Sequence, residues 1–341
     1  MRDFVAKRFA AAGPSVMASA AAEKNNYPDM IDLSIGDTDF TTDERIIRAA
    51  MADAKAGHTH YTDPQGDPEL IGAIRQFYAA EYHMPLEKEQ VFVTASSCFG
   101  MALALLTLLD PGDEVILFSP YFSPYKEQVE LAGGTAVEVP TFEADGFGID
   151  PARLEAAITP RTKALILNPC NPTGAAYDMD TYKAIAAAAK MHDLVVLADE
   201  IYTDYMYETG FLPLRALPGM AKRTITLNSF SKNYLMTGWR IGHIIAEPPI
   251  VAAMKRVNEN LVYSAPSVSQ RAALHALRLR SEIGDQYTAA YKERVFYAAQ
   301  RINAMPAFSV RPPQGTFYLF MNIQKTGMDS IAFCQRLVRE A

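Results

Sequence analysis

The chain has 341 residues, of which 49% are apolar and 21% are charged, an ordinary globular mixture. Its net charge of −7 argues against a nucleic-acid protein, because no basic excess is available to neutralise phosphates. No apolar run is long enough to cross a bilayer, and the N-terminal residues lack the apolar stretch of a signal peptide. We therefore expect a cytoplasmic protein, and the length suggests two domains.

Seven short, β-branched and apolar stretches predict strands. Each is continuous rather than alternating in polarity, as is typical of strands buried on both faces. Helical patterns at 98–109 and 178–193 separate several of them, which predicts βαβ units and a mainly parallel sheet. The predicted strands are 91–95, 114–119, 135–140, 163–168, 194–199, 224–229 and 241–246.

The pattern changes after about residue 250, where helical periodicity dominates. A long helix is predicted over 280–304, followed by a short hairpin over 308–323 and a further helix from residue 330. We predict a large domain over 36–250. We assign residues 1–35 to an N-terminal arm, whose first residues, 1–24, are interpreted as an amphipathic helix or arm, and residues 251–341 to a smaller α+β domain. The arm would lie with the smaller domain or across a partner subunit.

Metal and disulfide sites are not predicted. Three scattered cysteines, Cys98, Cys170 and Cys334, are too few for a disulfide framework or a zinc site. His58 and His60 lie two residues apart and supply too few ligands for a metal, so a turn or surface role is favoured.

A lysine just beyond the strand 224–229 is the first candidate for chemistry. Lys232 is flanked by Ser229 and Ser231, and open α/β sheets bind ligands at the carboxyl edge of their strands. Its amine could form a Schiff base with a carbonyl compound. Arg240, eight residues later, is a fixed cation suited to a phosphate. For this lysine taken alone, a solvated loop residue is the favoured interpretation.

Two further strand ends carry polar side chains. The strand 163–168 runs into Asn-Pro-Cys-Asn-Pro-Thr-Gly at 168–174, where two X-Pro steps rigidify the backbone. Asp199 ends the strand 194–199, with Tyr202 three residues later. A carboxylate at a buried strand end is costly unless it is paired, so we expect Asp199 to face a cation. A protonated pyridine nitrogen would serve.

Taken together, these segments resemble the fold type I pyridoxal-phosphate enzymes and, among them, the class I/II aminotransferases. The resemblance runs from about residue 31 to the end. It rests on the segment 168–174, on the Asp-x-x-Tyr of Asp199 and Tyr202, and on Ser-x-Ser-Lys ending at Lys232 with Arg240 following. It implies an aspartate aminotransferase-like α/β fold, in which helices sandwich a mostly parallel central sheet and a smaller α+β domain is attached.

The resemblance also implies roles for individual residues. Lys232 would hold pyridoxal 5′-phosphate covalently and move the proton at the substrate α-carbon. Asp199 would face the pyridine nitrogen and keep it protonated, so that the ring accepts electrons. Asn171 and Tyr202 would bond to the phenolic oxygen, and Asn171 would also contact the substrate. The phosphate would be bound by three side chains and by two backbone amides at a helix N-terminus, namely Ser229, Ser231, Arg240, Ser97 and Cys98.

Further positions follow from the same resemblance. Phe122 would stack on the cofactor ring, whereas its neighbours Tyr121 and Tyr125 receive no definite role. Tyr61 would reach the phosphate of another subunit, which implies a homodimer with shared sites. Ile35 and Gly36 would line the substrate pocket. One departure stands out, because the family more often has glycine where this chain has Ser96.

We expect an aminotransferase that moves an amino group between an L-amino acid and a 2-oxo acid by a ping-pong mechanism. Two alternatives remain: a C–S lyase or related β/γ-elimination enzyme on the same scaffold, and a non-enzymatic descendant. Family members usually continue beyond the helix at 330 and carry an arginine that binds the substrate α-carboxylate. Arg311, Arg336 and Arg339 lie in no matching context. We therefore expect a small domain that is incomplete at its C-terminus.

Overall fold

The computed structural model describes residues 4–6, 27, 29–208 and 210–340. The predicted N-terminal helix or arm therefore lies largely outside the described residues. Over the described part, no helix has the length and apolarity that a membrane span requires.

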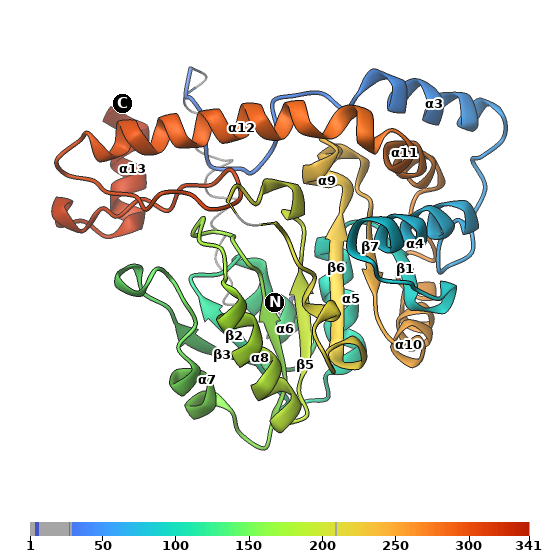
Figure 1. Cartoon of the computed structure of the whole chain (residues 1–341), viewed down its shortest axis with the longest axis horizontal. Helices are drawn as coiled ribbons and strands as arrows, with labels where there is room; N and C mark the ends of the chain where they lie inside the picture. The colour runs from blue at the N-terminus through green and yellow to red at the C-terminus, as the bar shows by residue number, and fades with distance from the viewer. Residues whose placement is uncertain (1–3, 7–26, 28, 209, 341) are drawn as a thin grey trace.

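A seven-stranded sheet forms the centre of the molecule, and every predicted strand is present within one or two residues (Figure 1). The strand order is β1-β7-β6-β5-β4-β2-β3. β7 runs antiparallel to both of its neighbours, and the other pairs are parallel, as the sequence predicts. The strands are β1 (Val91–Thr94), β2 (Glu114–Ser119), β3 (Thr135–Pro140), β4 (Thr162–Leu167), β5 (Val195–Asp199), β6 (Thr224–Ser229) and β7 (Gly242–Ile245).

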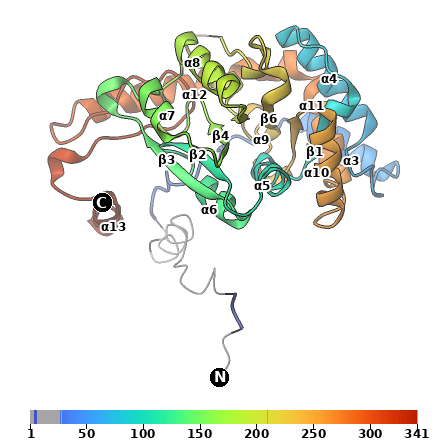
Figure 2. The same cartoon turned by 90° about the horizontal axis from the view of Figure 1, so that it is seen from below.

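Helices cover both faces of the sheet. Figure 2 shows α8 on one side, with α5 and α6 on the other. Successive residues of β2 explain this arrangement, since Val115 packs in the apolar core with α5 and α6, whereas Ile116 packs in the core with α7 and α8. The helices are α5 (Ser97–Leu108), α6 (Pro124–Leu131) and α10 (Pro248–Glu259) on one face, and α7 (Pro151–Ala157) and α8 (Met179–Met191) on the other.

The prediction that every strand is buried on both faces is wrong for β3. Of its six residues only Val139 is buried. β3 is the last strand of the sheet and pairs with β2 alone, so its outer edge has no further strand beside it. The continuous apolar pattern of β3 therefore does not indicate that both of its faces are buried.

A third core lies beside β1, the other edge of the sheet. It joins α3 (Glu44–Lys55), α4 (Pro68–Tyr82) and α11 (Ser267–Arg278) through buried side chains such as Ile46, Ile74 and Leu274. α11 contacts α3 and α4, and α10 contacts α5. The predicted division at residue 250 would assign α10 and α11 to the smaller domain, although both pack against helices of the larger one. The division itself stays a prediction.

The C-terminal part begins with α12 (Arg280–Asn303), the predicted long helix, and ends with α13 (Ser330–Glu340). The predicted hairpin over 308–323 is reduced to a single antiparallel bridge between Ser309 and Asn322. Two prolines, Pro312 and Pro313, remove ladder donors there. The residues that follow bond elsewhere, since the Gln314 amide donates to the Gly174 carbonyl and the Thr316 amide to the Tyr205 carbonyl.

Candidate active site

The carboxyl ends of β4, β5 and β6 are neighbours in the sheet and place three polar segments at one edge. β4 leads into Asn168, β5 ends at Asp199, and β6 leads directly into the one-turn helix α9 (Phe230–Asn233), which carries Lys232. Figure 1 shows α9 at the end of β6, with α12 crossing beyond this edge. The topology thus brings together residues that are far apart in the sequence.

Asp199 is a buried carboxyl with one satisfied oxygen. The Tyr125 hydroxyl donates to Oδ2 at 2.5 Å, and the Asn168 amide donates to the Tyr125 oxygen at 2.9 Å. Oδ1 is buried and has no hydrogen-bond partner among the described residues. Burial raises the pKa of Asp199 to about 6, whereas the hydrogen bond from the Tyr125 hydroxyl and a weaker interaction with the Ile201 backbone amide lower it. A cationic N–H donor would satisfy Oδ1 and hold the carboxyl ionised.

Lys232 is largely buried, and its amine donates to the Gly36 carbonyl. Burial lowers the pKa of Lys232 to about 8; the charge of Arg240 also lowers it, whereas that of Asp37 raises it. The amine lies 5.6 Å from the centre of the Phe317 ring. A neutral, nucleophilic amine is therefore accessible near neutral pH.

Tyr202 and Asn171 flank the same region. Tyr202 is buried, with its ring edge-on to Phe317 at 5.6 Å and to Tyr318 at 6.1 Å. The Asn171 amide donates to the Asn168 side chain at 3.2 Å, which folds the 168–174 turn back on the end of β4. The structure thus brings this turn and Tyr202 to the same edge as Asp199.

A cluster of hydroxyls and amides lies where α5 begins beside β7. The Ser229 and Ser231 hydroxyls are 2.8 Å apart, and the Ser231 amide donates to Ser229 Oγ at 3.0 Å. Gly242 pairs with Ser229, and a Cβ on Gly242 would lie 2.8 Å from the Ser97 nitrogen. The start of α5 and the two serines are therefore close neighbours, an arrangement that suits an anion.

Ser96 occupies the unusual position at this helix start. Its φ of 94° is a backbone conformation that favours glycine. The Ser96 hydroxyl offsets part of that strain by accepting the Phe99 amide at 3.2 Å as an N-cap. Cys98 follows in the first turn of α5; burial raises the pKa of its thiol, and Arg240 is close enough for its charge to oppose that rise. Arg240 is exposed and donates to the Thr237 carbonyl at 2.8 Å.

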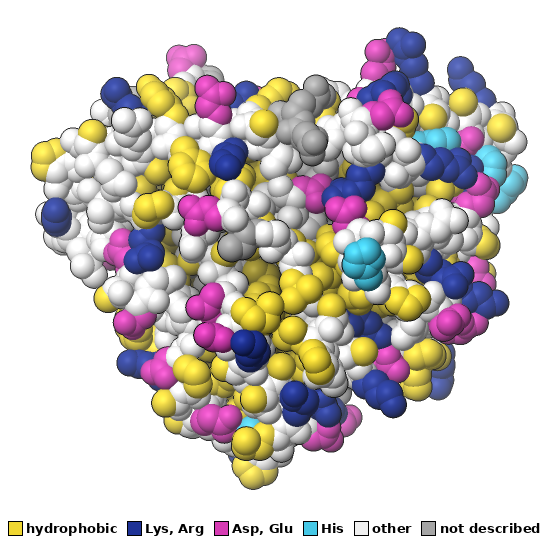
Figure 3. Space-filling view, in the orientation of Figure 1, with side chains coloured by type: hydrophobic (Ala, Val, Ile, Leu, Met, Phe, Trp, Pro, Cys, Tyr) yellow, Lys and Arg dark blue, Asp and Glu magenta, His cyan; other side chains and the backbone are white. Residues whose placement is uncertain are grey.

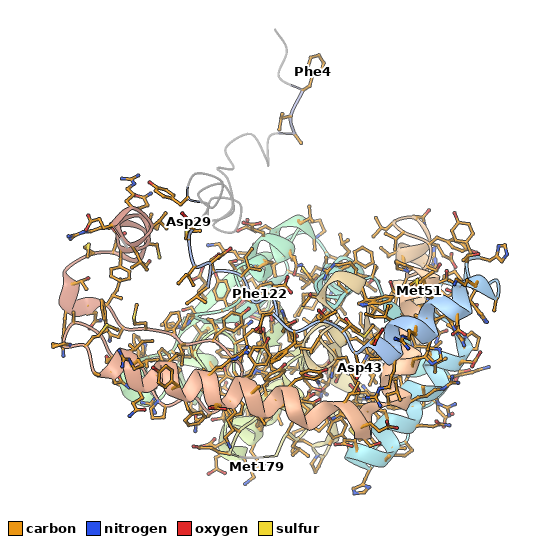
Figure 4. All side chains as sticks on the ribbon, turned by 90° about the horizontal axis from the view of Figure 1, so that it is seen from above. Phe4, Asp29, Asp43, Met51, Phe122 and Met179 are labelled. Carbon is orange, nitrogen blue, oxygen red and sulfur yellow. The ribbon has the colours of Figure 1, made fainter. Side chains whose placement is uncertain are left out.

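Phe122 lies beside this region and is labelled in Figure 4, a view from above toward the carboxyl edge. Its ring meets that of Tyr125 edge-on, with centroids 5.5 Å apart. Phe122 therefore contacts Tyr125, and Tyr125 in turn bonds to the buried carboxyl of Asp199.

The segment before α3 passes over Lys232. Gly36 lies so close to Tyr318 that a Cβ at this position would overlap the phenol oxygen at 1.5 Å, so any other residue would require the Tyr318 ring to move. Ile35 is 44% exposed beside it. Tyr61 is 84% exposed and packs edge-on against Tyr263 at 5.2 Å. Among the described residues, no contact joins Tyr61 to Lys232 of its own chain.

Sequence reasoning missed two aromatic residues that the structure places in this region. Tyr125 received no role, yet it is the donor to Asp199. Its position three residues after Phe122 in the first turn of α6 is a local signal that could have suggested a shared face. Tyr318 belongs to a segment more than a hundred residues away, and no local pattern connects it with Tyr202.

Comparison with known proteins adds independent findings. The family model described as aminotransferase class I and II matches residues 28–341. An aspartate aminotransferase of Pyrococcus horikoshii is 34% identical over 99% of this chain and 87% of its own length. An aspartate/prephenate aminotransferase of Thermus thermophilus is 36% identical over 95% of this chain and 84% of its own.

Solved structures agree with these relatives. The crystal structure of an aspartate aminotransferase from Rhizobium meliloti superposes with a TM-score of 0.93 at 31% identity. The superposition covers 99% of this chain and 89% of that one. The aspartate aminotransferase-like fold expected from the resemblance is confirmed.

Proposed function

The chain belongs to the class I and II aminotransferases. From that premise we propose that it transfers an amino group between an L-amino acid and a 2-oxo acid by a ping-pong mechanism. The proposed cofactor is pyridoxal 5′-phosphate, bound at the carboxyl edge of the sheet. The observation that carries the cofactor proposal is the buried Asp199 Oδ1, which lacks a hydrogen-bond partner among the described residues. A pyridinium N–H is the kind of partner such an atom requires.

The described residues fit this cofactor. When bound, pyridoxal phosphate supplies a carbonyl that takes up an amine and a ring that accepts electrons from the substrate α-carbon. Asp199 would hold the ring nitrogen protonated, and Phe122 would lie against the ring. Asn171 and Tyr202 would bond to the phenolic oxygen, with Asn171 also contacting the substrate.

Phosphate binding would use the cluster at the start of α5. Ser229 and Ser231 supply hydroxyls, and the backbone amides of Ser97 and Cys98 supply donors at the positive end of the helix dipole. Arg240 supplies the compensating charge.

Lys232 would act as the base that moves a proton. Its lowered pKa of about 8 leaves a useful fraction of neutral amine at neutral pH, so it can take the proton from the substrate α-carbon and return it. The carbonyl of Gly36 accepts a hydrogen bond from this amine and orients it, and Ile35 and Gly36 would line the substrate pocket.

The proposal includes a cytoplasmic homodimer with shared sites. The exposed ring of Tyr61 supports this proposal, because an aromatic side chain that is 84% exposed is available to a second copy. Light scattering coupled to size exclusion tests it, since a monomeric holoenzyme with full activity would contradict shared sites.

Aspartate is the first amino donor to test, because the relatives are named for aspartate and one of them also for prephenate. The decisive experiment adds each amino acid to the purified holoenzyme without an acceptor and follows the visible spectrum and the products. One equivalent of 2-oxo acid per site, with amine retained on the cofactor, supports the transaminase. Sustained release of pyruvate and ammonia without an acceptor would instead indicate the elimination enzyme.

A further inference from the structure

The two segments that carry Lys232 and Tyr202 are too short to hold their own orientation. α9 spans Phe230–Asn233, and the 3₁₀ helix η3 that follows Tyr202 spans Thr203–Tyr205. A single helical turn is unstable in isolation, because nucleation costs more than its few hydrogen bonds return. The positions of both residues therefore depend on tertiary contacts.

Two hydrogen bonds join these segments directly. The Asn233 side-chain amide donates to Thr203 Oγ1 at 2.6 Å. The Tyr205 hydroxyl donates to the backbone carbonyl of Lys232 at 3.1 Å. The first bond joins the neighbour of Lys232 to the neighbour of Tyr202. The second joins the backbone of Lys232 itself to the segment that follows Tyr202.

A third connection runs through Arg280, the first residue of α12. Its two terminal nitrogens donate to the two carboxylate oxygens of Asp204, both at 2.8 Å, and Nη1 also donates to the Tyr234 hydroxyl at 3.2 Å. Asp204 follows Tyr202 by two residues, and Tyr234 follows Lys232 by two. One planar guanidinium thus bonds to both segments at once, a geometry that lysine cannot reproduce.

The guanidinium is itself held in place. It lies 4.8 Å from the centre of the Phe77 ring and 5.8 Å from that of Tyr234. Glu81 of α4 is 3.7 Å away. The side chains of Arg280 and Asp204 are only 22% and 14% exposed, so this pair is more sheltered than a surface ion pair.

Arg280 and Asp204 line a groove of about 880 Å³ between α4, α12 and residues 204–207. Figure 3 shows apolar side chains exposed in this central part of the face, below α12 and beside α4. Water can therefore reach the pair from one side. Loss of the guanidinium would loosen the connection without leaving a sealed, unhydrated charge in the core.

We propose that Arg280 is a positioning residue for the transamination reaction: it ties the Lys232 segment to the Tyr202 segment and thereby fixes both side chains relative to the cofactor. This inference rests on the function proposed above for those two residues. The long helix α12 becomes the element against which the base and the ring-binding tyrosine are aligned.

The test compares Arg280→Gln and Arg280→Lys with the control Arg278→Gln. Arg278 lines the same groove and is 52% exposed, with Glu69 as its partner. For Arg280→Gln we expect kcat to fall about tenfold while KM changes less than about twofold, because misplacement of reacting groups costs rate rather than binding. The kcat of Arg280→Lys should lie between those of Arg280→Gln and the wild type, and the kcat of Arg278→Gln should match that of the wild type.

A second readout does not depend on turnover. The pH dependence with which an amine reagent labels Lys232 in cofactor-free protein reports the pKa of that amine. In Arg280→Gln a loosened α9 should expose the amine to water and raise its pKa above the wild-type value of about 8. The charged groups acting on Lys232, Asp37 and Arg240, are unchanged by the substitution.

Asp204→Asn and the double variant complete a cycle. If the two residues act as one connection, the double variant should be no slower than either single variant. The inference would be overturned if Arg280→Gln had the kcat and the labelling pKa of the wild type and differed only in a lower melting temperature. Arg280 would then have a stability role. Should Arg280→Gln fail to fold, Tyr234→Phe, which removes only the 3.2 Å bond, provides the same comparison. If Lys232→Ala kept full activity, the proposed function itself would fail instead.

Discussion

Replacing Tyr125 with phenylalanine isolates the hydrogen bond that controls Asp199. The substitution keeps the ring, and with it the edge-on packing against Phe122, but removes the hydroxyl that donates to Oδ2 at 2.5 Å. That hydroxyl stabilises the ionised carboxylate more than the protonated acid. Its loss should therefore raise the pKa of Asp199 further.

The magnitude follows from the burial of the pair. A hydrogen bond to a charged group contributes roughly 1.5–3 kcal/mol, which corresponds to about one to two pKa units. Since burial already raises the pKa of Asp199 to about 6, the variant should titrate near pH 7–8, by the same order-of-magnitude conversion. At pH 7 a large part of the population would then carry an uncharged Asp199.

The assay is the dissociation constant of pyridoxal phosphate from pH 5.5 to 9. Affinity should reach its plateau about one to two pH units higher in Tyr125→Phe than in the wild type, because only the ionised carboxylate pairs with a pyridinium. Tyr121→Phe is the matched control: Tyr121 is close in sequence and donates to the exposed Glu138 instead. The ionisation of the ligand phosphate affects all three proteins alike.

An unshifted plateau in Tyr125→Phe would refute the reasoning. It would mean either that the hydroxyl does not stabilise the carboxylate or that Asp199 does not face the ring nitrogen. An equal shift in Tyr121→Phe would point to a general change in the fold around α6.

Three other substitutions test separate parts of the site. Lys232→Ala should abolish the covalent bond to pyridoxal phosphate, change the visible absorbance near neutral pH and lower kcat by a factor of about 10³; an unchanged spectrum would remove Lys232 from its proposed role. Asp199→Ala should keep some cofactor bound yet lose about a hundredfold or more in kcat, and normal turnover would contradict the electron-acceptor argument. Glu200→Gln concerns stability: burial raises the pKa of Glu200 to about 8, so the folded state binds more protons than the unfolded state between pH 4.5 and about 8. The free energy of unfolding should therefore fall across that window in the wild type, by at most about 5 kcal/mol, and stay flatter in Glu200→Gln. Denaturant titrations at pH 5 and pH 8 measure this, and parallel pH profiles of the two proteins would contradict it.

The strands of the sheet were predictable because burial on both faces demands unbroken apolar, β-branched runs. When turn residues and helical patterns separate such short runs, a buried strand is the structure that fits them best. β3 shows the limit of that signal. Its residues Thr135–Pro140 look like those of a central strand, yet its place at the edge depends on which strands it pairs with. Strand order is a property of the assembled sheet.

The segment 308–323 was predicted as a hairpin from its composition and a Pro-Gly connection. In the structure the Ser309–Asn322 bridge joins its two ends, whereas the amides of Gln314, Gly315 and Thr316 bond to the carbonyls of Gly174 and Tyr205. A hairpin prediction considers only local partners. Here distant carbonyls beyond the ends of β4 and β5 accept hydrogen bonds from the same amides. The two prolines have no amide hydrogen, so a local hairpin would have fewer hydrogen bonds than these distant partners provide.

The residues of the candidate site also differ in whether a local sequence pattern identifies them. Lys232, Asp199 and Asn171 were identifiable because each lies in a local motif at a strand end. Tyr125, the donor to Asp199, had only a weak local signal, its spacing from Phe122. The ring of Tyr318 against Gly36 and the guanidinium of Arg280 were not identifiable, because each reaches the site from an element of its own.

By itself the sequence determined the order of strands and helices along the chain and the residue types at the strand ends, since local periodicity and motif spacing are properties of consecutive residues. Only the tertiary structure decided which strand ends meet, which hydroxyl supports the buried carboxyl, and which helix aligns the base. The physical reason is that a buried polar atom must find a partner in space. Two partners at this site come from far along the chain: Tyr125 is 74 positions from Asp199, and Gly36 is 196 positions from Lys232.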